Sequence, residues 1–221
     1  MQTQTPRSRK ERMAAWLNTA ALHWDRIAVF LLVLCLAAGL WWGCQRGISS
    51  AEAQVRLSLV GTAQGYLGCK EEDGSYLPIL EVYNGQECLP RDYSVTGDDS
   101  WCAVFGTAAA LQAGLADTIP PECSCGRQIE LFQGLGRWVE ADWYLPHPGD
   151  YIFYDWDNTS RRDSRGWPDH VGIVVETFGP VIKVIEGNKD DMVAYRYVFL
   201  DDPWIRGYGT PDYSSLHSQT K

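Results

Sequence analysis

Residues 169–187, DHVGIVVETFGPVIKVIEG, decide the fold of this chain. They contain two runs rich in β-branched residues, Val171–Thr177 and Val181–Ile185, which flank the turn-forming residues 178–180. β-Branched residues favour strands, and the Gly-Pro step between the runs favours a turn. The segment therefore predicts an antiparallel β-hairpin.

Further elements can be assigned on both sides of this hairpin. Asp150–Tyr154 and Met192–Phe199 are also β-branched and aromatic runs, and we expect them to be strands. The earlier part of the chain has helical patterns, which cover residues 50–68, a short stretch within 70–98, residues 98–113 before Gly114, and residues 126–136. Helices followed by consecutive strands predict an α+β domain with an antiparallel sheet.

The N-terminal part has the pattern of a membrane anchor. Residues 27–43, IAVFLLVLCLAAGLWWG, contain no charged residue, and five basic residues precede them, against Arg46 and Arg56 soon after. Such a run is at the short end of what spans a bilayer, and the basic leader places the N-terminus in the cytoplasm. A cleaved signal peptide is the alternative, since Ala51-Glu52-Ala53 fits the small-x-small cleavage pattern.

The charge of the chain changes after this anchor. From Gly47 onward the sequence has 13 Lys and Arg against 26 Asp and Glu, a net charge of −13. Phosphate backbones would repel so acidic a domain, which excludes nucleic-acid binding. We therefore expect five parts: a basic cytoplasmic segment (1–26), a transmembrane helix (27–43), a short linker (44–49), a catalytic domain (50–213) and a polar tail (214–221).

Seven cysteines divide by their position relative to the anchor. Cys35 and Cys44 belong to the apolar run and its edge, and the cysteines that follow it are Cys69, Cys88, Cys102, Cys123 and Cys125. In an oxidising compartment, five cysteines predict two disulfides and one free thiol, although spacing does not say which one is free. Zinc is a weaker interpretation, because Cys123-x-Cys125 lacks the usual two-residue gap and no His stands nearby.

Cys102 is the cysteine best placed to be reactive. It lies in the first turn of the helix predicted over residues 98–113, directly after Asp98-Asp99-Ser100, which are residues of the N-cap type. Backbone N–H groups converge at a helix N-terminus, and the helix dipole there favours a thiolate. A buried structural cysteine on an Ala-rich packing helix is the alternative interpretation.

His170 is the best candidate for a catalytic base. It opens the first strand of the hairpin, where it is held firmly and can face a cleft. With Thr177 paired to Val181, Glu186 falls diagonal to this histidine on the same face, within reach of a long side chain. A carboxylate there would hold the tautomer and orientation of the imidazole, the third role in a triad. This assignment depends on register, because a slip of one residue would turn the carboxylate to the wrong face. Asn188 lies just beyond and could serve instead.

Five segments occur in the order and at the spacing of CHAP domains, namely DDSWCAVF, HPGDYIFYDWD, DHVGIVVE, VIEGN and IRGYGTPDY. Over roughly residues 50–213 the chain resembles this family of cysteine, histidine-dependent amidohydrolases/peptidases of bacterial and phage cell walls. The resemblance implies a papain-like fold, in which a helix with the cysteine packs on an antiparallel sheet with the histidine. It also implies Cys102 as nucleophile, His170 as general base, Glu186 as orienting carboxylate and Asn188 as a nearby polar helper.

The same resemblance implies the activity and its setting. The expected substrate is peptidoglycan, cut at the amide that joins muramic acid to the stem peptide or within the peptides, with no cofactor. We expect a single-pass protein of the bacterial cell membrane with its catalytic domain outside, and cell-envelope or conjugation machinery as a further partner. The competing hypothesis is non-enzymatic: a catalytically inactive wall-binding component, or one that serves envelope assembly.

Two other patterns bear on binding. The loop 155–163, DWDNTSRRD, resembles an acidic calcium loop but lacks the Gly and Glu of an EF-hand, so we expect a solvated loop and no metal. Trp101 and Trp167 each stand beside a proposed catalytic residue. They are therefore the best candidates to line a groove for glycan.

Overall fold

The computed structural model describes residues 48–141, 143–156 and 166–214. The chain divides into two units, Met1–Ser49 and Ser50–Lys221, and nearly all described residues belong to the second. The predicted transmembrane helix at 27–43 lies outside the described residues. Within the described ranges, no helix is long and apolar enough to cross a membrane.

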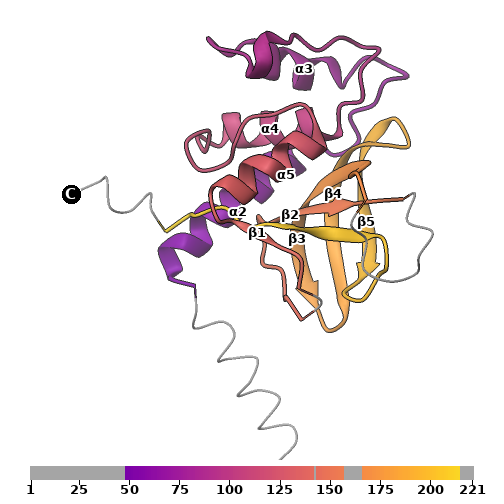
Figure 1. Cartoon of the computed structure of the whole chain (residues 1–221). Helices are drawn as coiled ribbons and strands as arrows, with labels where there is room; N and C mark the ends of the chain where they lie inside the picture. The colour runs from indigo at the N-terminus through magenta and orange to yellow at the C-terminus, as the bar shows by residue number, and fades with distance from the viewer. Residues whose placement is uncertain (1–47, 142, 157–165, 215–221) are drawn as a thin grey trace, which may run out of the picture. The chain divides into compact units, whose positions relative to one another are not determined.

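Helices followed by a six-stranded antiparallel sheet make up the described part of the chain, which confirms the α+β class (Figure 1). The helices are α2 (Ser50–Gln64), α3 (Leu77–Asn84), α4 (Cys102–Gln112) and α5 (Cys125–Gly134), with a short 3-10 turn, η1 (Pro90–Asp92). The strands are β1 (Trp138–Val139), β2 (Tyr151–Tyr154), β3 (His170–Phe178), β4 (Val181–Lys189), β5 (Met192–Phe199) and β6 (Ile205–Gly209). Their order in the sheet is β1-β6-β2-β3-β4-β5.

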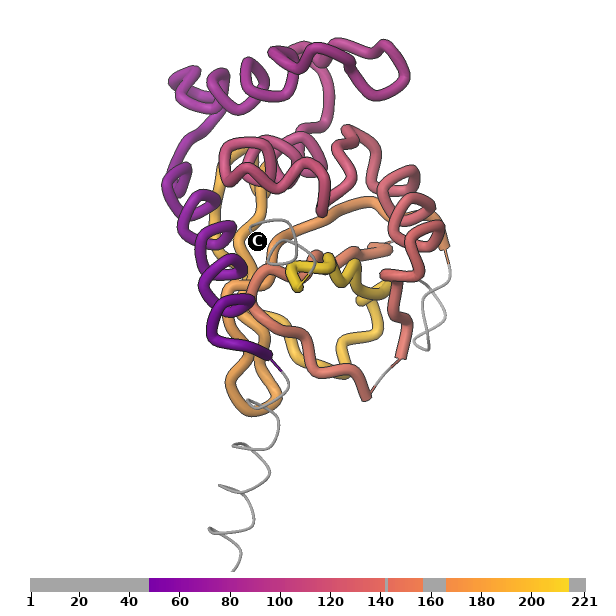
Figure 2. Tube along the Cα trace, turned by 90° about the vertical axis from the view of Figure 1, so that its left-hand side faces the viewer, coloured from indigo at the N-terminus to yellow at the C-terminus, as the bar shows by residue number. Residues whose placement is uncertain are grey.

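The strand pattern predicts the four consecutive strands β2 to β5 and misses β1 and β6. β1 has only two residues, and β6 has the sequence IRGYG, whose glycines weaken the strand signal. The helices gather on one side of the sheet (Figure 1). Figure 2 shows the chain rising along α2 to the α3 segment, which lies at the top of that view.

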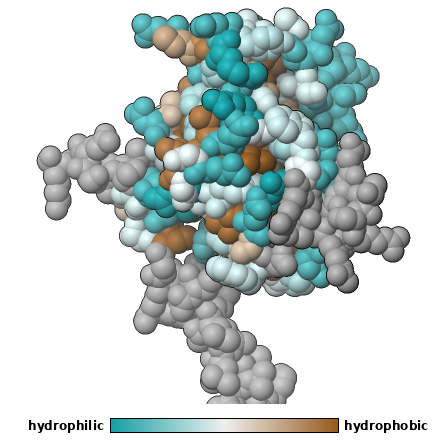
Figure 3. Space-filling view, in the orientation of Figure 1, coloured by the Kyte–Doolittle hydropathy of each residue, from teal (hydrophilic) through white to brown (hydrophobic). Residues whose placement is uncertain are grey.

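Hydrophobic residues pack on both faces of the sheet. One cluster joins the helices to the sheet and includes Phe105, Phe132 and Ile173. A second cluster lies on the opposite face and includes Ile152 and Val184. On the outer surface, the face drawn in Figure 3 shows hydrophobic residues only in scattered areas among hydrophilic ones.

Small residues let α4 approach the sheet closely. A Cβ atom on Gly106 would come within 2.8 Å of the Tyr151 ring, whose hydroxyl donates to the Gly106 carbonyl at 2.7 Å. On β4, a Cβ atom on Gly187 would lie 2.3 Å from the Cβ of Phe105. Because neither contact leaves room for a side chain, the N-terminal half of α4 is fixed against the strands.

The β3–β4 hairpin corrects the predicted register near its turn. The predicted pair Thr177–Val181 is wrong, because Val181 pairs with Phe178. Val175 is then an extra residue in β3, and the pairing shifts by one beyond it. At the His170 end of the hairpin, the register is therefore again the predicted one. The bulge leaves no mark in the sequence pattern, since a valine there simply continues the β-branched run.

Candidate active site

Cys102 is the first residue of α4, at the place predicted for a reactive cysteine. The predicted Asp/Ser cap is wrong, since Trp101 occupies the N-cap position and no side chain caps the helix. Asp99 instead accepts hydrogen bonds within its own loop, from Thr96 and from the Tyr93 hydroxyl. The backbone N–H groups at this helix end are therefore left to stabilise negative charge on the sulfur or on a bound group.

His170, Glu186 and Arg196 form a chain of polar contacts next to this sulfur. The Nε2 atom of His170 lies 3.1 Å from Oε2 of Glu186, which confirms that the two side chains share a face. The Nε atom of Arg196 donates to both carboxylate oxygens at 2.8 Å. Glu186 is fully buried, so the guanidinium supplies the counter-charge that a carboxylate needs away from water.

The contacts of the site shift the pKa values of the Cys102 thiol and the His170 imidazole toward their charged forms. A hydrogen bond from Cys125 is the largest influence on the pKa of Cys102, and together with His170 it outweighs burial and holds this pKa well below its usual value. Burial alone would lower the pKa of His170, but its contacts with Cys102 and Glu186 prevail and raise it to about 9. Both shifts favour a thiolate on Cys102 and an imidazolium on His170.

Aromatic rings fix the position of the imidazole. The ring of Tyr154 stacks on His170 at a centroid distance of 6.0 Å, and the ring of Trp156 lies 6.4 Å away. The guanidinium of Arg196 in turn lies 4.9 Å from the centre of the Trp156 ring. A planar cation on an aromatic face has little freedom to move, so this packing also holds the arginine against the carboxylate.

Cys125 is a second thiol in the site, which the sequence pattern left among the candidates for a disulfide. It is the first residue of α5, and its Sγ atom lies 3.5 Å from that of Cys102. The two expected disulfides are not formed, because all five cysteines of the described residues are free. Even this close pair of sulfurs is well outside the S–S bond length of about 2.05 Å.

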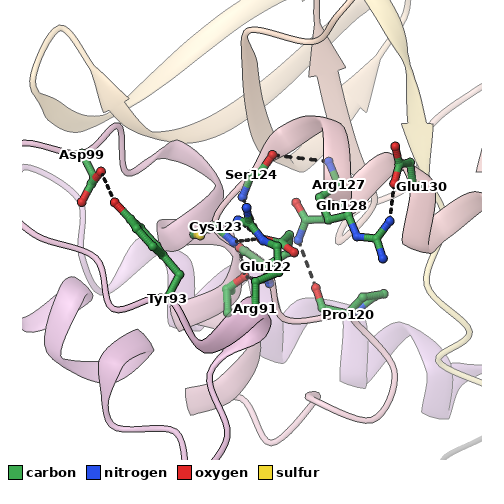
Figure 4. Close-up of polar contacts among 11 residues, drawn as sticks. Arg91, Tyr93, Asp99, Pro120, Glu122, Cys123, Ser124, Arg127, Gln128 and Glu130 are labelled. Carbon is green, nitrogen blue, oxygen red and sulfur yellow. Dashed lines mark hydrogen bonds and ion pairs between the residues drawn. The ribbon is translucent and has the colours of Figure 1, made fainter.

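A cavity of about 310 Å³ opens onto the two thiols. Residues 91–100, 123–125 and 168–169 supply most of its lining, and Cys102 is the contribution of α4. One wall holds the hydrogen bond from Tyr93 to Asp99 that Figure 4 shows. The cavity therefore gives a substrate access to a nucleophile that is itself only 5% exposed.

A buried carboxylate organises the wall that carries Cys125. Glu122 accepts a hydrogen bond from Arg91 at 2.6 Å and from the backbone N–H groups of Cys123 and Ser124 (Figure 4). The Arg91 guanidinium also contacts the sulfur of Cys123 at 3.0 Å. These contacts hold the short segment that enters α5.

The other residues singled out in the sequence have different positions. Trp101 cannot line a groove, because it is fully buried and its Nε1 atom donates to Glu71 at 2.7 Å. Trp167 is 70% exposed and lies against Gly126 of α5, so it stays a groove candidate. Asn188 has a left-handed backbone with φ of 55°, and among the described contacts no hydrogen bond joins its side chain to His170.

The structure offers no metal site in the part of the chain that it describes. No group of three or more His, Cys, Asp or Glu side chains there is arranged to hold an ion. Most of the acidic loop considered for calcium, residues 157–163, lies outside the described residues.

Arg196 and Cys125 are the site residues that sequence reasoning missed. Arg196 had a detectable signal: it is the one charged residue in the predicted strand 192–199, and it pairs with Val184, two residues from Glu186. Diagonal neighbours on adjacent strands are within reach of long side chains. Cys125 had no such signal, since its approach to α4 depends on how two helices pack.

A scan against protein-family models finds no match to this chain, and no curated protein matches it. A solved structure described as "The crystal structure of Ly7917" matches with a TM-score of 0.35 and 13% sequence identity. The match covers 71% of this chain and 62% of that chain, so it spans less than two thirds of the solved protein. A similarity this low does not establish a shared function.

Proposed function

We propose that this chain is a CHAP-type cysteine hydrolase that cleaves an amide bond of peptidoglycan. The observation that carries the proposal is the connected set Cys102, His170, Glu186 and Arg196. It combines an activated nucleophile, a base and an orienting carboxylate at the end of a helix and beside a cavity. Such a set has the parts that acyl transfer by a thiol requires.

In the proposed reaction, each step has a group of the site that can carry it out. The Cys102 thiolate attacks the amide carbonyl, and the N–H groups at the start of α4 receive the negative charge of the tetrahedral intermediate. The imidazolium of His170 then protonates the leaving amine, which produces a thioester and a neutral imidazole. That imidazole takes a proton from water, and the resulting hydroxide releases the acid and restores the thiolate. Because Glu186 engages Nε2, the ring nitrogen that exchanges protons is Nδ1.

The choice of substrate rests on the sequence motifs and the anchor pattern. Peptidoglycan lies outside the membrane, where the basic leader and the apolar run 27–43 would place the domain. The bond cut is the amide between muramic acid and the stem peptide, or one within the peptides. Cell-envelope or conjugation machinery is the kind of assembly in which a membrane-bound wall hydrolase would act.

The proposal is tested with the full-length protein, purified in detergent, on isolated cell walls. We expect the wild type to clear walls, and we expect Cys102→Ala to lose at least about 10⁴-fold in rate. Cys88→Ser is the matched control, because this exposed thiol lies away from the site cavity and its loss should leave clearing unchanged.

Mass spectrometry of the soluble products then identifies the bond. Freed lactyl groups of muramic acid indicate an amidase, and new amino termini within the peptides indicate an endopeptidase. Equal clearing by wild type and Cys102→Ala would refute the enzyme. Wall binding by both proteins without any product would favour the inactive wall-binding component instead.

A further inference from the structure

Two helices begin at cysteines that face each other in the site. Cys102 is the first residue of α4, Cys125 is the first residue of α5, and both are at least nine-tenths buried. Their sulfurs are 3.5 Å apart, in direct contact. A disulfide requires about 2.05 Å, so the sulfurs need to close by only about 1.5 Å.

The contact is built into the framework that joins the two helices. The Thr107 hydroxyl on α4 donates to the backbone carbonyl of Glu122 at 2.7 Å and accepts from its N–H at 3.0 Å. The Glu122 carboxylate holds the next two backbone N–H groups, those of Cys123 and Ser124, as Figure 4 shows. Two hydrogen bonds therefore join Glu122 to α4, and two more join Glu122 to the segment that enters α5.

The two sulfurs have opposite chemical character. The hydrogen bond from Cys125 lowers the pKa of Cys102, whereas the same contact, with burial, raises the pKa of Cys125 well above its usual value. Cys102 is therefore the sulfur that attacks an electrophile, and Cys125 stays protonated beside it. A reactive thiolate next to a second thiol is the arrangement in which sulfenic acids are resolved to disulfides.

Small oxidants can reach this pair. Both cysteines line the site cavity of about 310 Å³, which is far larger than a peroxide molecule. Cys123 lines the same cavity, but its sulfur is engaged by the Arg91 guanidinium at 3.0 Å. Cys125 is therefore the thiol best placed to react with an oxidised Cys102.

We propose that Cys102 and Cys125 are a site of reversible oxidative modification, at which a peroxide converts the two thiols into a disulfide that blocks the nucleophile. The Cys102 thiolate attacks one oxygen of hydrogen peroxide, the O–O bond breaks, and hydroxide leaves. The sulfenic acid formed has lost two electrons to the peroxide. The Cys125 sulfur then attacks the oxidised sulfur, the S–O bond breaks, and the hydroxyl leaves as water with the Cys125 proton. The loss of hydrolysis that follows rests on the proposed function, whereas the disulfide itself does not.

The bond is tested directly by peptide mapping. Full-length wild-type protein is exposed to hydrogen peroxide, its remaining thiols are alkylated without reduction, and the digest is analysed by mass spectrometry. We expect a linked peptide pair that contains Cys102 and Cys125 and disappears on reduction. Cys88→Ser should form the same pair, because its thiol lies outside the site cavity. Cys102 found only as sulfinic acid, or linked to another cysteine, overturns the proposal.

The consequence for activity is tested with Cys125→Ser and Cys125→Ala. Peroxide should abolish wall clearing by the wild type, and dithiothreitol should restore it. In both variants, peroxide should cause a loss of wall clearing that dithiothreitol does not reverse. The sulfenic acid on Cys102 then lacks the adjacent thiol of residue 125 and is oxidised further to sulfinic acid. Full recovery in both variants refutes the proposed role of Cys125.

The two proposals fail in different ways. If Cys102→Ala clears walls as well as the wild type does, the proposed hydrolase is wrong, whatever the peptide map shows. If Cys102→Ala is inactive but the linked peptides are missing, only the oxidative site is wrong.

Discussion

Two fully buried carboxylates, Asp150 and Glu186, are each paired with an arginine, yet their surroundings differ. The Arg56 guanidinium donates to Asp150 at 2.8 Å, and the Tyr144 hydroxyl and a backbone N–H occupy the other oxygen at 2.6 and 2.9 Å. Burial and the nearby carboxylate raise the pKa of Tyr144, so this phenol stays a donor. All partners of Asp150 therefore keep their protonation across the usual range of pH.

Glu186 instead contacts a group that titrates near neutral or alkaline pH, the imidazole of His170. Its second partner after Arg196 is His170, which also contacts the Cys102 thiol beside an open cavity. The comparison shows that a buried carboxylate–arginine pair does not by itself mark a functional site. What distinguishes the two is whether the pair leads to a group that can exchange a proton with a ligand.

Among changes at the two carboxylate–arginine pairs, the largest effect is expected for Glu186→Gln. An amide keeps the shape but cannot balance the imidazolium, so the rate of wall hydrolysis should fall by about 10²- to 10⁴-fold. The measurement is product release by the purified full-length variant, with circular dichroism to show that it is folded. Activity close to that of the wild type would remove Glu186 from the proposed mechanism.

The matched change at the other carboxylate, Asp150→Asn, should act on stability. An amide at this place sets an N–H group against donors and leaves Arg56 with Glu52 as its remaining counter-charge. We expect this change to lower the free energy of unfolding by about 3–5 kcal/mol. Urea unfolding followed by tryptophan fluorescence measures the loss. The rate per folded molecule should stay near that of the wild type. A loss of rate without a loss of stability would contradict the comparison.

A smaller effect is expected for Arg196→Lys. Lysine keeps the charge but lacks the planar guanidinium, which lies over the Trp156 ring while its Nε atom donates to both oxygens of Glu186. Loss of one charged hydrogen bond of about 1.5–3 kcal/mol corresponds to a loss of roughly 10- to 10²-fold in rate. Arg196→Met should lose more than the lysine variant, and equal rates for the two would assign the arginine to packing alone.

The smallest change is a shift in the pH profile. The ion pair exists above the lowered pKa of Cys102 and below the raised pKa of His170, so kcat/KM should fall as pH rises through about 9. Glu186→Gln removes one of the influences that raise the pKa of His170, and its alkaline limb should move to lower pH. Residual activity of that variant is sufficient for this measurement. An unchanged limb would mean that another group controls it.

Much of this arrangement could be predicted from the sequence, because short-range patterns determine it. The β-branched runs predict strands β2 to β5, and alternation along them predicts the shared face of His170 and Glu186. The same patterns fail where the outcome depends on distant parts of the chain. The Asp99 side chain accepts hydrogen bonds from its own loop instead of capping α4. The Trp101 ring is buried and donates a hydrogen bond to Glu71, which lies 30 residues earlier in the sequence.

The bulge at Val175 divides the hairpin into a stretch that tolerates changes in length and one that does not. Adding or removing one residue of β4 between Val184 and Glu186 would turn this carboxylate to the opposite face and separate it from Arg196. Toward Gly179, an added residue changes only the turn. The tip of the hairpin is therefore the place to graft an epitope or a fluorophore. A deletion of one residue nearer the site would break the ion pair between Glu186 and Arg196.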